Sequence, residues 1–173
     1  MPIVFHGTGG GGGGTWSKVK EKPDWTNCTV MYGGTALSSS ATTTDSAAQY
    51  KVISRSTGST GDIFTKSATL PKGLYSVMIR MKVSTISSSS NVFKLTIVDG
   101  STTTTKYIRP SMFKTANGYT TFGTAVENTS GTLRVTLSIY NTLSNQTVCV
   151  DYLAITPAID LQHHQILLWR KYC

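Results

Sequence analysis

Two apolar runs towards the C-terminal end of the sequence constrain the fold more than any other feature. Between Leu133 and Tyr140, apolar and polar residues alternate, which is the pattern of a β-strand with one buried face. A polar turn at 141–146 leads to a second run, Val148–Ile155, which is apolar at both parities. Either this second strand is covered on both faces, or a bulge near Asp151 changes which residues point inward. In both cases the strand lies inside a sheet, because an edge would leave its apolar side chains in water.

Segments with the same alternation recur along the chain, and the strongest of them is Tyr75–Val83. Turn residues at Pro71–Gly73, Asp99-Gly100 and Asn117-Gly118 separate such segments. Pro110 ends a short strand and places it near a sheet edge, because proline cannot donate to the ladder. With a loop at 37–46, the expected strands are 25–32, 49–54, 63–70, 74–83, 93–97, 106–109, 119–126, 133–140 and 148–155. This set, without a helical pattern, predicts an all-β fold, an antiparallel β-sandwich.

The composition limits the partners that the chain can have. Serine and threonine make up 48 of the 173 residues and only 14% of the residues are charged, so hydroxyl groups carry much of the solubility. Lysine and arginine number 16 against 8 acids, which gives a net charge of +8. The basic residues are spread along the chain without forming a cluster, so a nucleic-acid partner is not expected.

No segment is long and apolar enough to span a membrane, so membrane insertion is not expected. The first residues also lack a basic segment followed by an apolar one, which predicts synthesis in a host cytoplasm without a signal peptide. Cys28, Cys149 and Cys173 do not have the spacing of a metal site. Cys28 and Cys149 could form a disulfide if the first and last strands are neighbours, and buried free thiols are the favoured alternative.

The two ends of the chain differ in composition from the segment between them. Residues 1–24 contain the glycine run Gly9–Gly14 and are expected to form a Gly-rich N-terminal arm. Residues 25–157 hold the β-sandwich pattern, and residues 158–173 are expected to form a C-terminal docking tail. Apolar residues of the arm and the tail are predicted to contact neighbouring subunits of a homo-oligomer: Ile3, Val4, Phe5, Ile166, Leu167, Leu168 and Trp169.

Two segments of the sandwich resemble strands of galactose-binding-like jelly rolls, the fold of many carbohydrate-binding modules. LPKGLYSVMIRMKV resembles a strand of that family, and YTTFGTAVENTSGTLRVTLSIYN together with VCVDYLAITP is similar to its last three strands. The resemblance covers about residues 61–157 and implies a jelly-roll β-sandwich. It also implies that exposed aromatic residues stack on a sugar ligand. The same jelly roll is used in phage and archaeal-virus decoration, head-fibre and tail proteins.

Candidate ligand-binding residues are aromatic side chains that could stack on a sugar ring: Trp16, Tyr107, Tyr119 and Tyr140. For each of them, packing in the core or at an interface is the alternative. Asp151 lies within an apolar strand, so its carboxylate must be hydrogen-bonded, paired with a cation or at the solvent face. One hypothesis is a structural Ca²⁺ ion bound by Asp151, because jelly-roll modules often carry one. The other is a hydrogen bond that caps a loop.

No catalytic residue and no further cofactor are predicted. The carboxylates are scattered singly, and nothing marks the facing pair that a glycosidase needs. His163 and His164 are adjacent, so their side chains diverge, and they lack a third ligand for a metal. The sequence therefore predicts a protein that is not an enzyme.

Two functions follow as hypotheses. The first is a virion structural protein, such as a bacteriophage capsid decoration, head-fibre or tail component, which assembles with other virion proteins through its terminal arms. The alternative is a carbohydrate-binding module, displayed on a virion or extracellular, that recognises cell-surface or polysaccharide glycans.

Overall fold

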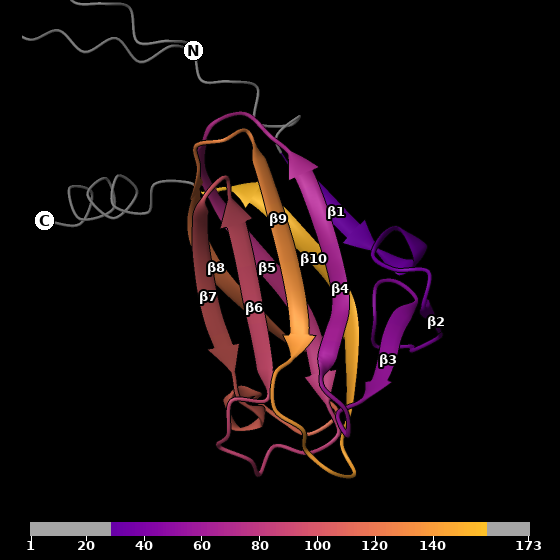
Figure 1. Cartoon of the computed structure of the whole chain (residues 1–173). Coiled ribbons are helices and arrows are strands. Elements are labelled where there is room, and N and C mark those ends of the chain that lie inside the picture. Colours follow the sequence, from indigo (N-terminus) through magenta and orange to yellow (C-terminus); the bar gives the residue numbers. More distant parts are fainter. Residues whose placement is uncertain (1–28, 159–173) are drawn as a thin grey trace, which may run out of the picture.

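The computed structural model describes residues 29–158, which fold into two antiparallel sheets packed face to face (Figure 1). The six-stranded sheet contains β1 (Val30–Gly33), β2 (Ala41–Thr43), β3 (Val52–Ser56), β5 (Gly73–Val83), β8 (Thr120–Asn128) and β10 (Thr147–Pro157). The four-stranded sheet contains β4 (Gly61–Thr69), β6 (Phe93–Asp99), β7 (Thr102–Ile108) and β9 (Thr132–Ile139). Short 3₁₀ helices at Gly34–Ala36 and Pro110–Met112 are the helical turns of this part of the chain.

The strand order is that of a jelly roll. With β1 and β2 set aside, β3-β10-β5-β8 in one sheet packs against β4-β9-β6-β7 in the other. From β3 to β10 the chain crosses between the sheets at every connection except the β6–β7 hairpin. This arrangement brings strands from the two ends of the domain side by side in each sheet. The predicted all-β, antiparallel β-sandwich of the jelly-roll type is therefore confirmed.

Most predicted strands are confirmed within a few residues. β10 lies between β5 on one side and β3 and β1 on the other, so it is the interior strand that its apolar sequence requires. β7 is an edge strand, as Pro110 indicated, although it begins at Thr102 and not at Lys106. The loop predicted at 37–46 was wrong in part, because β2 lies within it. β2 has only 3 residues and one buried side chain, Ala41, which is too little sequence to show alternation.

β10 contains a bulge at Asp151, as one of the two interpretations of its sequence predicted. Its pairing with β5 shifts between Val150 and Tyr152. On the other side of β10, β3 pairs with residues 147–150 and β1 pairs with residues 152–155. The bulge therefore marks the place where β10 changes neighbours. Alternation resumes after it at the opposite parity, and the buried apolar residues facing the core are Val148, Val150, Leu153 and Ile155.

The core lies between the two sheets and is built from the inward side of each alternating strand. In β5, every second residue from Tyr75 to Val83 is buried. From the facing sheet, β9 contributes Leu133, Val135 and Leu137, which are all fully buried. The opposite sides of the same strands carry mostly polar side chains, so each sheet leaves an outer face that is available for contacts.

Several predictions concern residues outside the described range. The assembly residues of the arm and the tail lie there, and so does Trp16, so the proposed domain boundaries and the assembly role stay predictions. Cys149 is a partly buried free thiol, and Cys28, with which a disulfide was the less favoured alternative, lies outside the range. Within residues 29–158, no helix is long and apolar enough to cross a membrane.

The end of β6 is fastened to the turn between β8 and β9 by Asp99. Its buried carboxylate accepts hydrogen bonds from the backbone N–H groups of Thr129 and Ser130, each at 2.8 Å, and from the Thr129 hydroxyl. Hydrogen bonds from Ser130 and Thr129 hold the pKa of the Asp99 carboxyl below its ordinary value of 3.8. The ionised form of Asp99 therefore stabilises this end of the sandwich.

Acid is expected to weaken the Asp99 contact. A carboxyl whose pKa is lower in the folded chain stabilises the fold above its unfolded pKa, and this contribution is lost as the pH falls through the folded pKa. We therefore expect Asp99→Asn to be less stable than the wild type at neutral pH and the difference to shrink below pH 3.8. Urea unfolding of both proteins over a series of pH values measures this. Parallel pH profiles would contradict the assignment.

Candidate functional site

The structure brings two of the four predicted binding residues together. Tyr107 in β7 and Tyr140, directly after β9, lie beside each other, with ring centroids 5.1 Å apart and ring planes at 55°. Tyr107 is 41% exposed and Tyr140 is 43% exposed. We call these two residues the tyrosine pair. Tyr119 lies on the other sheet, next to the start of β8.

Strand pairing explains how the tyrosine pair forms. β6 lies between β7 and β9. Lys94 in β6 is aligned with Tyr107 on β7 and with Ser138 on β9. Tyr140 follows Ser138 at the same parity, and its backbone N–H donates to the Val92 carbonyl at 2.7 Å, which continues the pairing beyond β9. The two rings therefore reach across β6 and meet on the outer face of the four-stranded sheet.

Polar side chains border the tyrosine pair. Lys94 Nζ lies 5.3 Å from the centre of the Tyr140 ring. The Asn141 side-chain amide donates to the Asn91 carbonyl at 2.8 Å, and Arg109 Nε donates to Asn91 Oδ1 at 3.0 Å. These bonds tie the segments that follow β7 and β9 to the segment that precedes β6. Cations and amides therefore lie beside the two rings, and hydrogen bonds through Asn91 fix the positions of Arg109 and Asn141.

The face that carries the tyrosine pair is rich in hydroxyl groups. One transverse row across its four strands consists of threonines, in the order Thr65, Thr136, Thr96 and Thr105. The hydroxyl oxygens of Thr65 and Thr136 are 3.0 Å apart and share a hydrogen bond. The sheet face thus offers hydrogen-bond donors and acceptors next to exposed aromatic rings.

The Tyr107 hydroxyl is protonated at neutral pH. Burial, followed by the neighbouring Tyr140, raises its pKa above the ordinary value of 10.0. A protonated phenol can both donate and accept a hydrogen bond. Tyr107 can therefore offer a polar edge as well as an apolar ring face.

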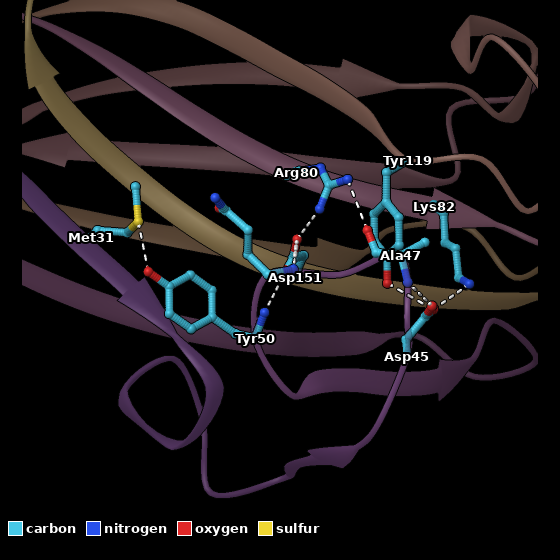
Figure 2. Close-up of polar contacts among 9 residues, drawn as sticks. Met31, Asp45, Ala47, Tyr50, Arg80, Lys82, Tyr119 and Asp151 are labelled. Carbon is cyan, nitrogen blue, oxygen red and sulfur yellow. Dashed lines mark hydrogen bonds and ion pairs between the residues drawn. The ribbon is translucent and has the colours of Figure 1, made fainter.

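Tyr119 belongs to a polar network on the six-stranded sheet (Figure 2). Its hydroxyl donates to Asp45 at 3.0 Å, and its ring centre lies 4.3 Å from the guanidinium carbon of Arg80 and 5.1 Å from Lys82 Nζ. Lys82 also forms an ion pair with Asp45. Burial, together with the hydrogen bond to Asp45, raises the pKa of Tyr119. The ring and the hydroxyl are both engaged within the chain, which favours the packing alternative for this residue.

Asp151 lies in the same network (Figure 2) and has no exposed surface. Its carboxylate forms an ion pair with Arg80 and accepts hydrogen bonds of 2.9 to 3.1 Å from the backbone N–H groups of Gln49 and Tyr50. Arg80 also donates to the Ala47 carbonyl at 3.0 Å. Asp151 and Arg80 therefore fasten the loop between β2 and β3 onto β10 and β5.

These contacts match the hydrogen-bonded, cation-paired alternative for Asp151. The Arg80 guanidinium supplies the positive charge that a calcium ion would bring, so the geometry lends no support to calcium at this carboxylate. Within residues 29–158, no group of three or more His, Cys, Asp and Glu side chains could hold a metal ion. Calcium binding by Asp151 stays a prediction.

A hollow of about 260 Å³ lies between β7 and β8, which are the outermost strands of their sheets on one side of the sandwich. It is lined by Ile97, Asp99, Thr102, Thr104, Ala125, Val126, Glu127 and Thr129. The Asp99 carboxylate is already bound by the turn after β8, and no aromatic side chain belongs to this lining. The hollow therefore offers no stacking surface, in contrast to the tyrosine pair.

Sequence reasoning singled out both tyrosines but none of the polar residues at their border. The sequence did indicate that Tyr140 is outward-facing, because the alternation in β9 puts it on the polar side of the strand. What the sequence lacks is the pairing of β6 with β7 and β9, which places Lys94 between the two tyrosines. Asn91, Arg109 and Asn141 lie in connecting segments, where no periodic pattern indicates a neighbour.

No protein-family model matches the sequence, and no curated protein matches it either. Among solved structures, the fold is similar to the CBM36-1 domain of a multidomain xylanase from the hindgut metagenome of Trinervitermes trinervoides. That likeness has a TM-score of 0.45 and 13% identity, and it covers 76% of this chain and 98% of that domain.

Two further solved structures are similar to this chain. TmCBM61, solved in complex with β-1,4-galactotriose, has a TM-score of 0.40 and 13% identity over 74% of this chain and 81% of that one. The C-terminal domain of EclA, a sugar-binding protein, has a TM-score of 0.42 and 15% identity over 65% of this chain and 81% of that one. At TM-scores below 0.5, these likenesses carry no argument about function, which must come from the site itself.

Proposed function

We propose that this protein binds a glycan at the tyrosine pair on the outer face of its four-stranded sheet. The observation that carries the proposal is the pairing of two exposed tyrosine rings, 5.1 Å apart, within a face that is otherwise polar. Exposed aromatic rings that pack against each other on a polar sheet face indicate a contact surface more than a structural need.

The chemistry of the surface suits a sugar. A pyranose ring presents an apolar face of C–H groups that stacks on an aromatic ring, and its rim carries hydroxyl groups that need hydrogen-bond partners. The tyrosine pair offers two tilted ring faces, and Lys94, Asn141 and the threonine row offer donors and acceptors beside them. Because the rings are inclined at 55° to each other, successive sugar units of a twisted chain could each contact one ring.

Removing either ring is expected to weaken binding. Tyr107→Ala and Tyr140→Ala should each raise the dissociation constant for a bound glycan about tenfold, because each removes one stacking surface. A glycan array with the full chain identifies a ligand, and calorimetry with that ligand compares the variants. The melting temperature should stay close to that of the wild type, because both rings lie on the outer face of the sheet and not in the core between the sheets.

Tyr50→Ala is the matched control for these two variants. Tyr50 is 40% exposed, but it lies in the loop before β3, beside the other sheet, where it packs edge-on against Tyr152 with centroids 6.5 Å apart. Its loss should leave glycan affinity unchanged. If the array shows no binding, or if Tyr50→Ala weakens binding as much as Tyr107→Ala does, the proposed site is wrong.

The virion role stays a prediction beside this proposal. It rests on the assembly residues of the arm and the tail, and nothing in residues 29–158 points to it. Glycan recognition by the sandwich is compatible with it, because a protein displayed on a virion could use the same surface to hold a host glycan. The proposed activity is recognition without catalysis.

A further inference from the structure

We propose that the glycan bound at the tyrosine pair is anionic and carries carboxylate or sulfate groups, an inference that rests on the proposed function. Its basis is a local excess of positive charge at the border of the rings. Lys94 and Arg109 both lie there, and no acidic side chain within residues 29–158 forms an ion pair with either of them.

On the outer face of the six-stranded sheet, two cations are paired with acids. The ion pairs of the described residues are Arg80 with Asp151 and Lys82 with Asp45, and both lie on the six-stranded sheet. There, acids of β10 and of the loop before β3 neutralise the two outward cations of β5. Lys94 of β6 lies over the Tyr140 ring much as Arg80 and Lys82 lie over the Tyr119 ring, but it has no acid as an ion-pair partner within residues 29–158. Its charge is therefore available to a ligand that stacks on the Tyr140 ring.

Arg109 is oriented for an anionic group. Its Nε donates to Asn91 Oδ1 at 3.0 Å, and Asn91 is itself held by the Asn141 amide. The two terminal nitrogens of the guanidinium have no hydrogen-bond partner within residues 29–158. A guanidinium fixed through its Nε presents the remaining N–H groups in the planar fork that matches a carboxylate or a sulfate.

The acidic side chain in the same transverse row does not cancel these charges. The row runs from Asp62 on β4 through Ser138 and Lys94 to Tyr107. Two strand spacings separate the backbones of Asp62 and Lys94 by about 10 Å, and their side chains form no ion pair. The Asp62 carboxylate instead has its hydrogen-bond partner in the Ser138 hydroxyl, which donates to Asp62 Oδ1 at 2.7 Å.

The test compares acidic glycans with neutral partners of the same backbone. The probes are polygalacturonate, hyaluronate and chondroitin sulfate, each beside its carboxyl-reduced or desulfated form, measured with the full chain by calorimetry. We expect at least one acidic probe to bind about tenfold more tightly than its neutral partner, since Lys94 and Arg109 each contribute up to about fivefold. That preference should fall as the salt concentration rises.

Charge variants separate a local effect from a general one. Lys94→Gln and Arg109→Gln should each lower affinity for the acidic probe about fivefold, and Lys94→Arg should retain it. Lys72→Gln is the matched control, because Lys72 is an exposed cation in the turn between β4 and β5, next to the end of β8 and remote from the tyrosine pair. It should bind the acidic probe like the wild type.

Each result decides a different question. If the neutral partners bind as tightly as the acidic probes, or if only neutral glycans bind while Tyr107→Ala abolishes that binding, the inference fails and the proposed function stands. Equal losses in Lys72→Gln and Lys94→Gln also overturn the inference, because the attraction would then be that of a basic protein as a whole. If no glycan of either kind binds, both the inference and the proposed function fail.

Discussion

Asp151→Ala is expected to lower the free energy of unfolding by about 3–5 kcal/mol, the range found when one partner of a buried ion pair is removed. Asp151 is fully buried, and the Arg80 side chain opposite is only 25% exposed. The substitution leaves Arg80 without its partner charge and also leaves the N–H groups of Gln49 and Tyr50 without acceptors. Urea unfolding followed by circular dichroism measures the change.

Asp45→Ala is the control for this prediction. Asp45 also forms an ion pair with an outward cation of β5, but its side chain is partly exposed, at 15%. Its hydrogen bond with Lys82 lowers the pKa of the Asp45 carboxyl, so the residue is ionised at neutral pH. Because both side chains of this pair keep some contact with water, the cost should be smaller than that of Asp151→Ala, about 1–2 kcal/mol. If Asp45→Ala and Asp151→Ala lower the free energy of unfolding equally, the contacts of Asp151 are not the main ones that hold the loop between β2 and β3.

How much the sequence could predict is illustrated by Asp151. An acid inside an apolar run must be hydrogen-bonded, paired with a cation or at the solvent face, and the parity around it indicated either a strand covered on both faces or a bulge. The structure selects the hydrogen-bonded ion pair and the bulge from these alternatives. The identity of the partners was not predictable, because Arg80 lies 71 residues away and Gln49 lies 102 residues away. Only the pairing of β10 with β5 and the path of the loop before β3 bring them together.

The same limit applies to the candidate site. The sequence named Tyr107, Tyr119 and Tyr140 as equivalent candidates, because exposed and engaged tyrosines look alike in a single chain. Alternation assigns a residue to one side of a strand but does not say which strands are neighbours. The jelly-roll order puts β7 and β9 on either side of β6, which joins two of the tyrosines and leaves Tyr119 on the opposite sheet.

The largest loss of stability from a single core substitution is expected for Phe93→Ala. Phe93 is the first residue of β6 and is fully buried. Its ring packs edge-on against Phe113, with centroids 6.4 Å apart, and Phe113 packs against Phe122 at 4.8 Å. Truncation removes a large buried surface and leaves a cavity between the sheets, so the free energy of unfolding should fall by about 3–5 kcal/mol.

Lys94, the next residue along β6, gives this prediction its control. Its side chain points to the opposite face of the sheet, towards the tyrosine pair, so Lys94→Gln should change the free energy of unfolding by less than about 0.5 kcal/mol. Phe93→Ala should therefore lower the urea midpoint without changing any residue of the proposed ligand surface. Lys94→Gln should lower the affinity for the acidic glycan and leave the urea midpoint nearly unchanged. Because successive residues of a strand face opposite sides, a single step along β6 separates the residue that stabilises the fold from the residue proposed to bind the ligand. If Phe93→Ala unfolds no more readily than Lys94→Gln, then Phe93 is not held in the core as the structure places it.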